Sequence, residues 1–222
     1  MLKVPRVLMI CTLLLAGCGQ VQPSASPAAQ AVQGAPMQAE PAISVQGQMT
    51  VSRTELANGH KIAIALVEGR YFEEWTTPGP FMGKNWEGEF RLQWLDEAGH
   101  ELHAVSLNTS FQGEQLAFNG DFTIYTDDYN GDGDLDFVIG QYGSSNGSVY
   151  RIFTLKQAEQ CIQELGLDTE GGGLFVSSSD GRYSIPLTKT AKDAFRVSYY
   201  DNAQGAHIES TYKWDRDRFV KQ

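Results

Sequence analysis

Apolar and polar residues alternate along most of the chain after residue 50, as they do in half-buried β-strands. The stretch HKIAIALVEG places Ile62, Ile64 and Leu66 on one face of an expected strand. The stretch EFRLQWLDEAGHELHAVSL predicts a hairpin that turns near Gly99. Further strands are expected in DFTIYT, LDFVIGQY, SVYRIFTL, GLFVSSSDGRYSIPL and the segment that begins AFRVSYYD. Short strands separated by Gly, Asn and Asp turns predict an all-β domain of antiparallel sheets over residues 50–222.

One segment departs from this alternation. In LKQAEQCIQELG, apolar residues recur at helical spacing, at Leu155, Ala158, Cys161, Ile162 and Leu165. The spacing predicts a short helix over residues 156–165 that buries Cys161 as an unreactive thiol. Residues 171–173, Gly-Gly-Gly, are expected to be a connector, because they lack the strand-to-helix setting of a phosphate-binding loop.

The first residues of the chain have the pattern of a secretory signal peptide. Lys3 and Arg6 precede an apolar run from Val7 to Ala16, shorter than the about 20 apolar residues that a membrane-spanning helix needs. The run ends in LAGC, which resembles the lipobox of bacterial lipoproteins. The resemblance implies that residues 1–17 are a lipoprotein signal peptide and that Cys18 carries a diacylglycerol. An ordinary signal peptide with a chance cysteine at its end is the alternative.

Residues 18–49 have the composition of a flexible tether. They are rich in Ala, Gln, Pro, Ser and Gly, and Glu40 is their one charged residue, so they bury too little apolar area to offset the entropy of ordering. A tether of this kind has a root-mean-square reach of about 30 Å, and two acyl chains on Cys18 give a lasting anchor. We therefore expect an extracytoplasmic domain that is lipid-anchored to the bacterial cell membrane, or to the outer membrane of a Gram-negative host.

The net charge bears on the class of partner, and the cysteine content bears on disulfide bonds. The formal net charge is −10, and removal of Lys3 and Arg6 with the signal peptide makes it −12. No basic patch is visible, which excludes a nucleic-acid partner. With Cys11 removed and Cys18 lipidated, Cys161 is the one cysteine left in the domain, so no internal disulfide forms.

Five aspartates crowd the stretch TDDYNGDGDLDFVIG, between two groups of apolar strand formers. Like charges at this spacing repel one another unless water or a cation separates them. Oxygen-bearing side chains fall at Asp128, Asn130, Asp132 and Asp136. Gly133 permits a sharp turn, and calcium takes six to eight oxygen ligands in a loose shell. The loop 128–136 therefore predicts a Ca²⁺ site, and a solvated acidic turn is the alternative.

The end of the loop distinguishes between two families of calcium loop. An EF-hand needs an acidic residue at its twelfth position and flanking helices, whereas Ile139 stands there and the flanks are expected strands. The loop instead resembles the calcium loop of FG-GAP or VCBS-type repeats, which form the blades of integrin-like β-propellers. The resemblance implies side-chain ligands from Asp128, Asn130, Asp132 and Asp136, and a carbonyl ligand from Asp134. One copy of the motif is present, which favours a partial or degenerate β-propeller-like arrangement, or a β-sandwich.

Two classes of function stay open. Glu73 and Glu74 lie in an aromatic-rich stretch, and paired acids beside aromatic residues occur in glycosidases. His100 and His103 are three apart on an expected strand and so face opposite sides, and no serine has a recognisable partner base. No catalytic residue is therefore assigned. We expect a calcium-stabilised binding or accessory module at the cell envelope, with a protein or glycan ligand; the alternative is an envelope hydrolase acting on polysaccharide or cell-wall material.

Overall fold

The computed structural model describes residues 42–79, 81–177 and 182–222. These residues belong to one unit, Ala39–Gln222. The predicted signal peptide, Cys18 and the tether up to residue 41 lie outside the described residues. Within the described part, no helix is long and apolar enough to cross a membrane.

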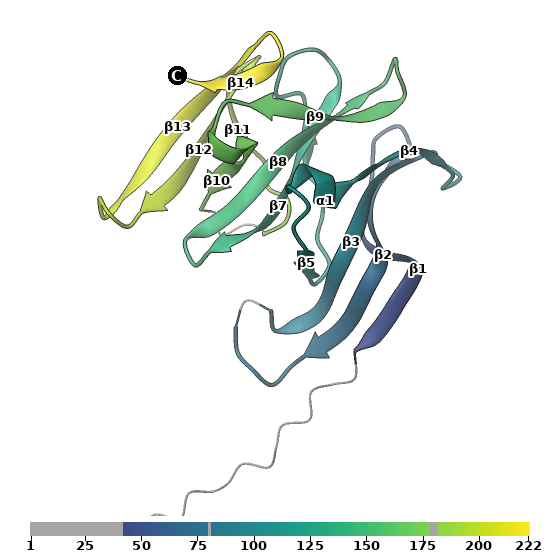
Figure 1. Ribbon diagram of the computed structural model, residues 1–222. Coiled ribbons are helices and arrows are strands. Elements are labelled where there is room, and N and C mark those ends of the chain that lie inside the picture. Colours follow the sequence, from purple (N-terminus) through teal and green to yellow (C-terminus); the bar gives the residue numbers. More distant parts are fainter. Residues whose placement is uncertain (1–41, 80, 178–181) are drawn as a thin grey trace, which may run out of the picture. The chain divides into compact units, whose positions relative to one another are not determined.

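The described residues form two β-sheets, which confirms the predicted all-β class (Figure 1). The first sheet is antiparallel, in the order β1-β2-β3-β4, with β5 against the other end of β3. Its strands are β1 (Ile43–Glu55), β2 (Lys61–Glu74), β3 (Gly83–Leu95), β4 (Glu101–Ser106) and β5 (Leu116–Asn119). The short helix α1 (Leu107–Ser110) follows β4, and Ser106 caps its first turn.

The second sheet has the order β11-β12-β13-β14-β9-β8-β7-β6, with β10 also on β8. Its first strands are β6 (Thr126–Asp127), β7 (Leu135–Ser144), β8 (Gly147–Lys156), β9 (Cys161–Leu167) and β10 (Leu174–Val176). The later strands are β11 (Thr188–Ala191), β12 (Ala194–Asp201), β13 (Ala206–Asp215) and β14 (Arg218–Lys221). The 3₁₀ turn η1 (Glu170–Gly172) lies between β9 and β10.

Three groups of consecutive strands, β1–β4, β6–β9 and β11–β14, are each an antiparallel up-and-down meander. Four-stranded units of this kind make propeller blades, which stand around a central channel. Here the second and third meanders instead join edge to edge, because β14 pairs with β9 in parallel. The first meander therefore forms a separate sheet, which faces the larger, curled sheet formed by the other two meanders.

The β7–β8 hairpin is buried on both faces. One face packs into a core shared with the first sheet and contributes Phe137, Ile139, Phe153 and Leu155. The opposite face packs into a second core beneath β11–β14 and contributes Val138, Tyr150 and Ile152. In Figure 1 the hairpin accordingly runs between β3 and the strands β11–β14.

The predicted helix over residues 156–165 is wrong. The chain turns after β8, with Gln160 at a φ of 50°, and returns as β9, where Leu155 pairs with Ile162. Ile162 belongs to the first core and Leu165 to the second. On a strand covered on both faces, apolar residues three apart are both buried, which imitates helical spacing. Cys161 is a free, partly exposed cysteine at the start of β9.

Other boundaries also differ from those expected, and in GLFVSSSDGRYSIPL only Leu174–Val176 forms a strand among the described residues. Strand β1 begins at Ile43 rather than residue 50, because Ile43–Glu55 pairs with β2 and buries Val45 within a Gln-rich stretch. In DFTIYT, only Thr126 is in a strand. The backbone of the preceding residues binds side chains instead, since the Ile124 N–H donates to Thr54 Oγ1 at 2.8 Å and the Tyr125 N–H to Ser184 Oγ at 3.2 Å.

Gly69 and Gly88 face each other where β2 and β3 approach closely. A Cβ on Gly88 would lie 2.1 Å from the Glu68 carbonyl oxygen, and its φ is 145°. We predict that Gly88→Ala lowers the free energy of unfolding by ~3 kcal/mol or more, by clash and backbone strain together. Gly99→Ala is the control, since φ there is 90° but no atom lies within 4 Å of the added Cβ. If urea denaturation shows that Gly88→Ala and Gly99→Ala lose equal free energy of unfolding, a clash at Gly88 is contradicted.

Candidate metal centre

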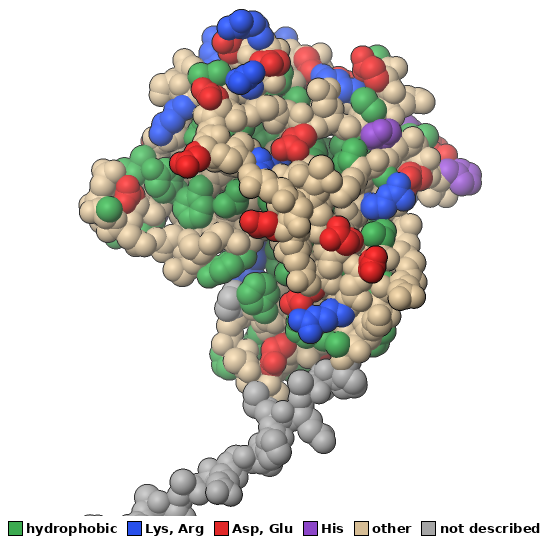
Figure 2. Space-filling model, in the orientation of Figure 1, with side chains coloured by type: hydrophobic (Ala, Val, Ile, Leu, Met, Phe, Trp, Pro, Cys, Tyr) green, Lys and Arg blue, Asp and Glu red, His purple; other side chains and the backbone are tan. Residues whose placement is uncertain are grey.

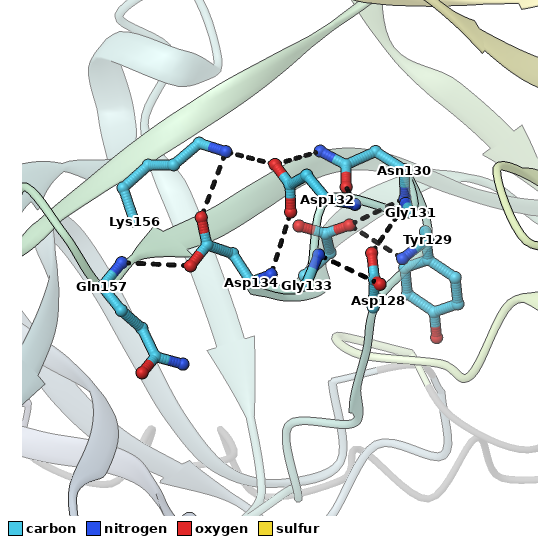
Figure 3. Close-up of polar contacts among 10 residues, drawn as sticks. Asp128, Tyr129, Asn130, Gly131, Asp132, Gly133, Asp134, Lys156 and Gln157 are labelled. Carbon is cyan, nitrogen blue, oxygen red and sulfur yellow. Dashed lines mark hydrogen bonds and ion pairs between the residues drawn. The ribbon is translucent and has the colours of Figure 1, made fainter.

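The acidic loop connects β6 to β7 at the base of the buried hairpin. Thr126 pairs with Phe137 and Asp127 with Asp136, so both ends of the loop are held in one antiparallel ladder. Asp136 lies in turn opposite Thr154 of β8. The predicted ligands Asp128, Asn130, Asp132 and Asp134 therefore lie in one loop (Figure 3), and Asp136 lies directly after it, in β7.

Side-chain oxygens bind the loop's own backbone. The Asp128 carboxylate accepts hydrogen bonds from the N–H groups of Gly131 at 2.7 Å and Gly133 at 3.2 Å. Asn130 Oδ1 accepts from the Asp132 N–H at 3.0 Å, and Asp132 Oδ1 accepts from the Asp134 N–H at 2.9 Å. Gly133 has a φ of 96°, in the region that glycine adopts without strain. These contacts wrap the backbone tightly around its acidic side chains.

Two lysines from outside the loop contact it. Lys156, at the end of β8, forms ion pairs with Asp132 and, at 3.2 Å, with Asp134 (Figure 3). Lys189 of β11 donates to the Asp128 carbonyl oxygen and lies 3.2 Å from an Asp127 oxygen. Burial acts to raise the pKa of Asp132, but the hydrogen bonds from Lys156 and the Asp134 N–H outweigh it and lower that pKa. The protein thus supplies part of the positive charge that the loop requires.

Asp136 differs from the other four predicted ligands because it is fully buried, at 0% exposure. Its Oδ2 accepts from the N–H groups of Tyr129 at 2.8 Å and Asn130 at 3.1 Å. Its Oδ1 makes no hydrogen bond of normal length and angle among the described residues, and neither does the Thr154 hydroxyl, on the residue that pairs with Asp136 from β8. Burial raises the pKa of Asp136 to about 6, against the smaller, opposing effects of Thr154 and the two N–H groups.

The donor chemistry of the loop fits Ca²⁺, whose ligands are carboxylate, amide and carbonyl oxygens. The unpartnered Asp136 Oδ1 is an oxygen of the kind that such an ion would satisfy. In the described residues, no three Asp, Glu, His or Cys side chains converge closely enough to form a metal-binding group. Asp132, which pairs with Lys156, would be among the residues that hold such an ion.

The two acids of the hydrolase alternative do not face each other as a pair. Glu73 accepts hydrogen bonds from the Tyr71 hydroxyl and, at 2.7 Å, from Trp75 Nε1, and the Tyr71 contact chiefly lowers the pKa of Glu73. Glu74 binds the turn that follows, and its pKa is lowered mainly by the Thr76 hydroxyl. A general acid needs a raised pKa, so neither carboxyl is prepared for that role.

The histidines lie at separate places. His100 is an exposed partner of Asp96, at 3.1 Å, whereas His103 Nδ1 accepts a hydrogen bond from the Ile162 N–H at 3.1 Å. Lys156 and Lys189 are not predictable from the sequence as neighbours of the loop, because they come from β8 and β11. Only the pairing of β8 with β7 reveals the contact of Lys156.

Comparisons with known proteins add no relative. No family model matches the chain, and no curated protein or solved structure is significantly similar to it. The resemblance of the loop to FG-GAP or VCBS-type repeats therefore stays a prediction from residues 126–140.

Asp136 predicts an unusual dependence of stability on pH in the presence of chelator. Its pKa in the folded protein, about 6, lies above the ordinary value of 3.8. The contribution of Asp136 to the free energy of unfolding is therefore most favourable below pH 4 and is lost as pH rises through 6. The loss amounts to ~3 kcal/mol. In urea denaturation between pH 4 and 7, Asp136→Asn should flatten this decline. An unchanged pH profile in the variant would contradict the assignment.

Proposed function

We propose that the protein is a lipid-anchored extracytoplasmic lipoprotein whose β-domain is stabilised by Ca²⁺ and acts as a binding or accessory module at the cell envelope. The observation that carries the calcium part is the buried carboxylate of Asp136, whose Oδ1 lacks a partner among the described residues. Unpaired buried carboxylates are costly. A divalent ion in the loop would offset that cost.

The residues that would hold the ion are those expected from the sequence. Asp128, Asn130, Asp132 and Asp136 would bind through side chains, and Asp134 through its carbonyl. When bound, Ca²⁺ supplies positive charge and fixes the loop. Outside cells a dissociation constant of ~0.1–1 mM is sufficient for occupancy, so the role proposed for the ion is structural rather than signalling.

The surface supports a binding role more than a catalytic one. Large hydrophobic side chains are exposed around the ends of β2, β3 and β7: Trp75, Phe81, Met82 and Tyr142. The Phe81 and Tyr142 rings meet edge to face, with centroids 5.9 Å apart. Exposed apolar clusters mark interaction sites, whereas the carboxyl groups of Glu73 and Glu74 are held by local hydrogen bonds.

A thermal melt of the purified protein tests the calcium site. At 5 mM Ca²⁺ and a dissociation constant of ~0.1 mM, binding stabilises the folded state by about 2 kcal/mol. We expect the midpoint to rise by roughly 5 °C relative to chelator, and Asp132→Ala to abolish the rise.

The matched control is Asp217→Ala, since Asp217 is an exposed acid paired with Arg218 outside the loop. This variant should keep the full calcium response. If calcium leaves the midpoint of the unmodified protein unchanged, the acidic loop is a turn held by Lys156 and Lys189, and the calcium proposal fails.

The lipid anchor is tested separately in cells. Cys18→Ser should abolish incorporation of a labelled fatty acid and move the protein from the membrane fraction to the soluble extracytoplasmic fraction, because the thioether cannot form. Cys161→Ser is the control and should leave both unchanged. Continued labelling of the Cys18 variant would rule out this anchor.

A further inference from the structure

Arg151 is a buried cation whose ion pair among the described residues, with Glu164, is a long one. It lies in the middle of β8 and is 8% exposed. Its Nε has no hydrogen-bond acceptor among the described residues. The Glu164 carboxylate is 3.7 Å from its Nη1, which is longer than a hydrogen bond. The Phe111 ring, 5.7 Å from the guanidinium carbon, adds a cation–π contact. A buried charge with so few partners requires an explanation.

The guanidinium lines a cavity of about 410 Å³. The volume lies in the range of small-molecule sites. Aromatic and aliphatic walls come from the end of α1, the ends of β7 and β8, and β10: Phe111, Tyr142, Val149 and Phe175. Figure 2 shows one face of the molecule, where hydrophobic and acidic side chains lie beside one another. The cavity is separate from the acidic loop and shares no residue with it.

The glycine turn leaves room for the guanidinium. A Cβ on Gly172, whose φ is 65°, would lie 2.8 Å from Arg151 Nη1. The turn is tied to the end of α1, because Gln112 Nε2 donates to the Gly171 carbonyl oxygen at 3.4 Å. The stretch expected to be a plain connector therefore forms one side of the cavity, directly against the arginine.

Two acids stand at the opening of the same cavity. Glu114 and Glu170 both line it and both are exposed. The cavity thus has a cation at its base, apolar walls and two anions at its rim. The rim acids repel a dianion such as phosphate, whereas a molecule with a carboxylate at one end and an ammonium group nearby meets opposite charge at both. The planar fork of arginine matches a carboxylate.

We infer that this cavity binds a small α-amino carboxylate with an apolar or aromatic side chain. The carboxylate meets Arg151, the ammonium group faces Glu114 and Glu170, and the side chain packs against Tyr142 and Phe175. The inference rests on the proposed binding role and names a ligand class for it, but it is independent of the calcium loop.

Calorimetric titration with three probes tests the inference. L-Phenylalanine carries both charges, L-phenylalaninamide lacks the carboxylate, and 3-phenylpropanoate lacks the ammonium group. We expect L-phenylalanine to bind, and each of the other two at least 10-fold more weakly. Arg151→Met should weaken binding of L-phenylalanine at least 10-fold. The melting midpoint of this variant should be unchanged or higher, because an apolar side chain replaces a poorly paired buried charge.

A second variant keeps the test decisive if Arg151→Met does not fold. Glu114→Gln with Glu170→Gln changes exposed side chains only. It should weaken binding of L-phenylalanine several-fold but not that of 3-phenylpropanoate, which should bind equally or more tightly because the rim no longer repels its carboxylate. Arg196→Gln, at an exposed arginine that pairs with Glu209 on β13, is the control and should bind like the unmodified protein.

Two results would overturn the inference. The first is no detectable binding of L-phenylalanine by the unmodified protein at millimolar concentration. The second is binding that neither Arg151→Met nor the double glutamate variant weakens. The calcium melt separates this failure from that of the calcium proposal, because the calcium response does not involve the cavity. If the protein responds to calcium but does not bind L-phenylalanine, the amino-carboxylate site is refuted and the calcium proposal is not.

Discussion

Burial of the β7–β8 hairpin on both faces is the constraint on which the rest of the structure depends. Phe137 and Phe153 point into the core shared with the first sheet, and Val138 and Ile152 into the core beneath β11–β14. Each fully buried side chain of this size contributes ~1.5–3 kcal/mol. The hairpin thereby joins the two cores, and its residues 136–140 and 150–155 are buried, whereas its tip is exposed.

Polar groups on such a hairpin are held as firmly as the apolar ones, and they cannot turn to solvent. Asp136 is fully buried at one end and Arg151 is 8% exposed in the middle. Each keeps an atom without a hydrogen-bond partner among the described residues. Because such groups cost free energy unless they are satisfied, we propose a bound species of opposite charge at each. The two proposed sites therefore follow from one feature of the fold.

The sequence predicts the strands well where one face is buried, as in the β3–β4 hairpin. It also indicates a sharp turn at Gly133, whose φ is 96°, whereas the Ca²⁺ site in this loop stays a prediction. The prediction of secondary structure fails where both faces of a strand are covered, because the spacing of the buried residues Ile162 and Leu165 on β9 then matches that of a helix. The sequence also does not predict Lys156 beside Asp132, or the cavity around Arg151. These contacts depend on strand pairing and on the curl of the second sheet, which local periodicity does not encode.

Hydrogen exchange of backbone amides, followed by NMR with calcium and with chelator, tests most directly whether an ion at the base of the hairpin offsets the burial of Asp136. We expect calcium to slow exchange of the Tyr129 and Asn130 amides, which donate hydrogen bonds to Asp136, and of the β7 amides beyond them. Unchanged exchange at these amides, with calcium-dependent changes elsewhere or nowhere, would contradict this expectation.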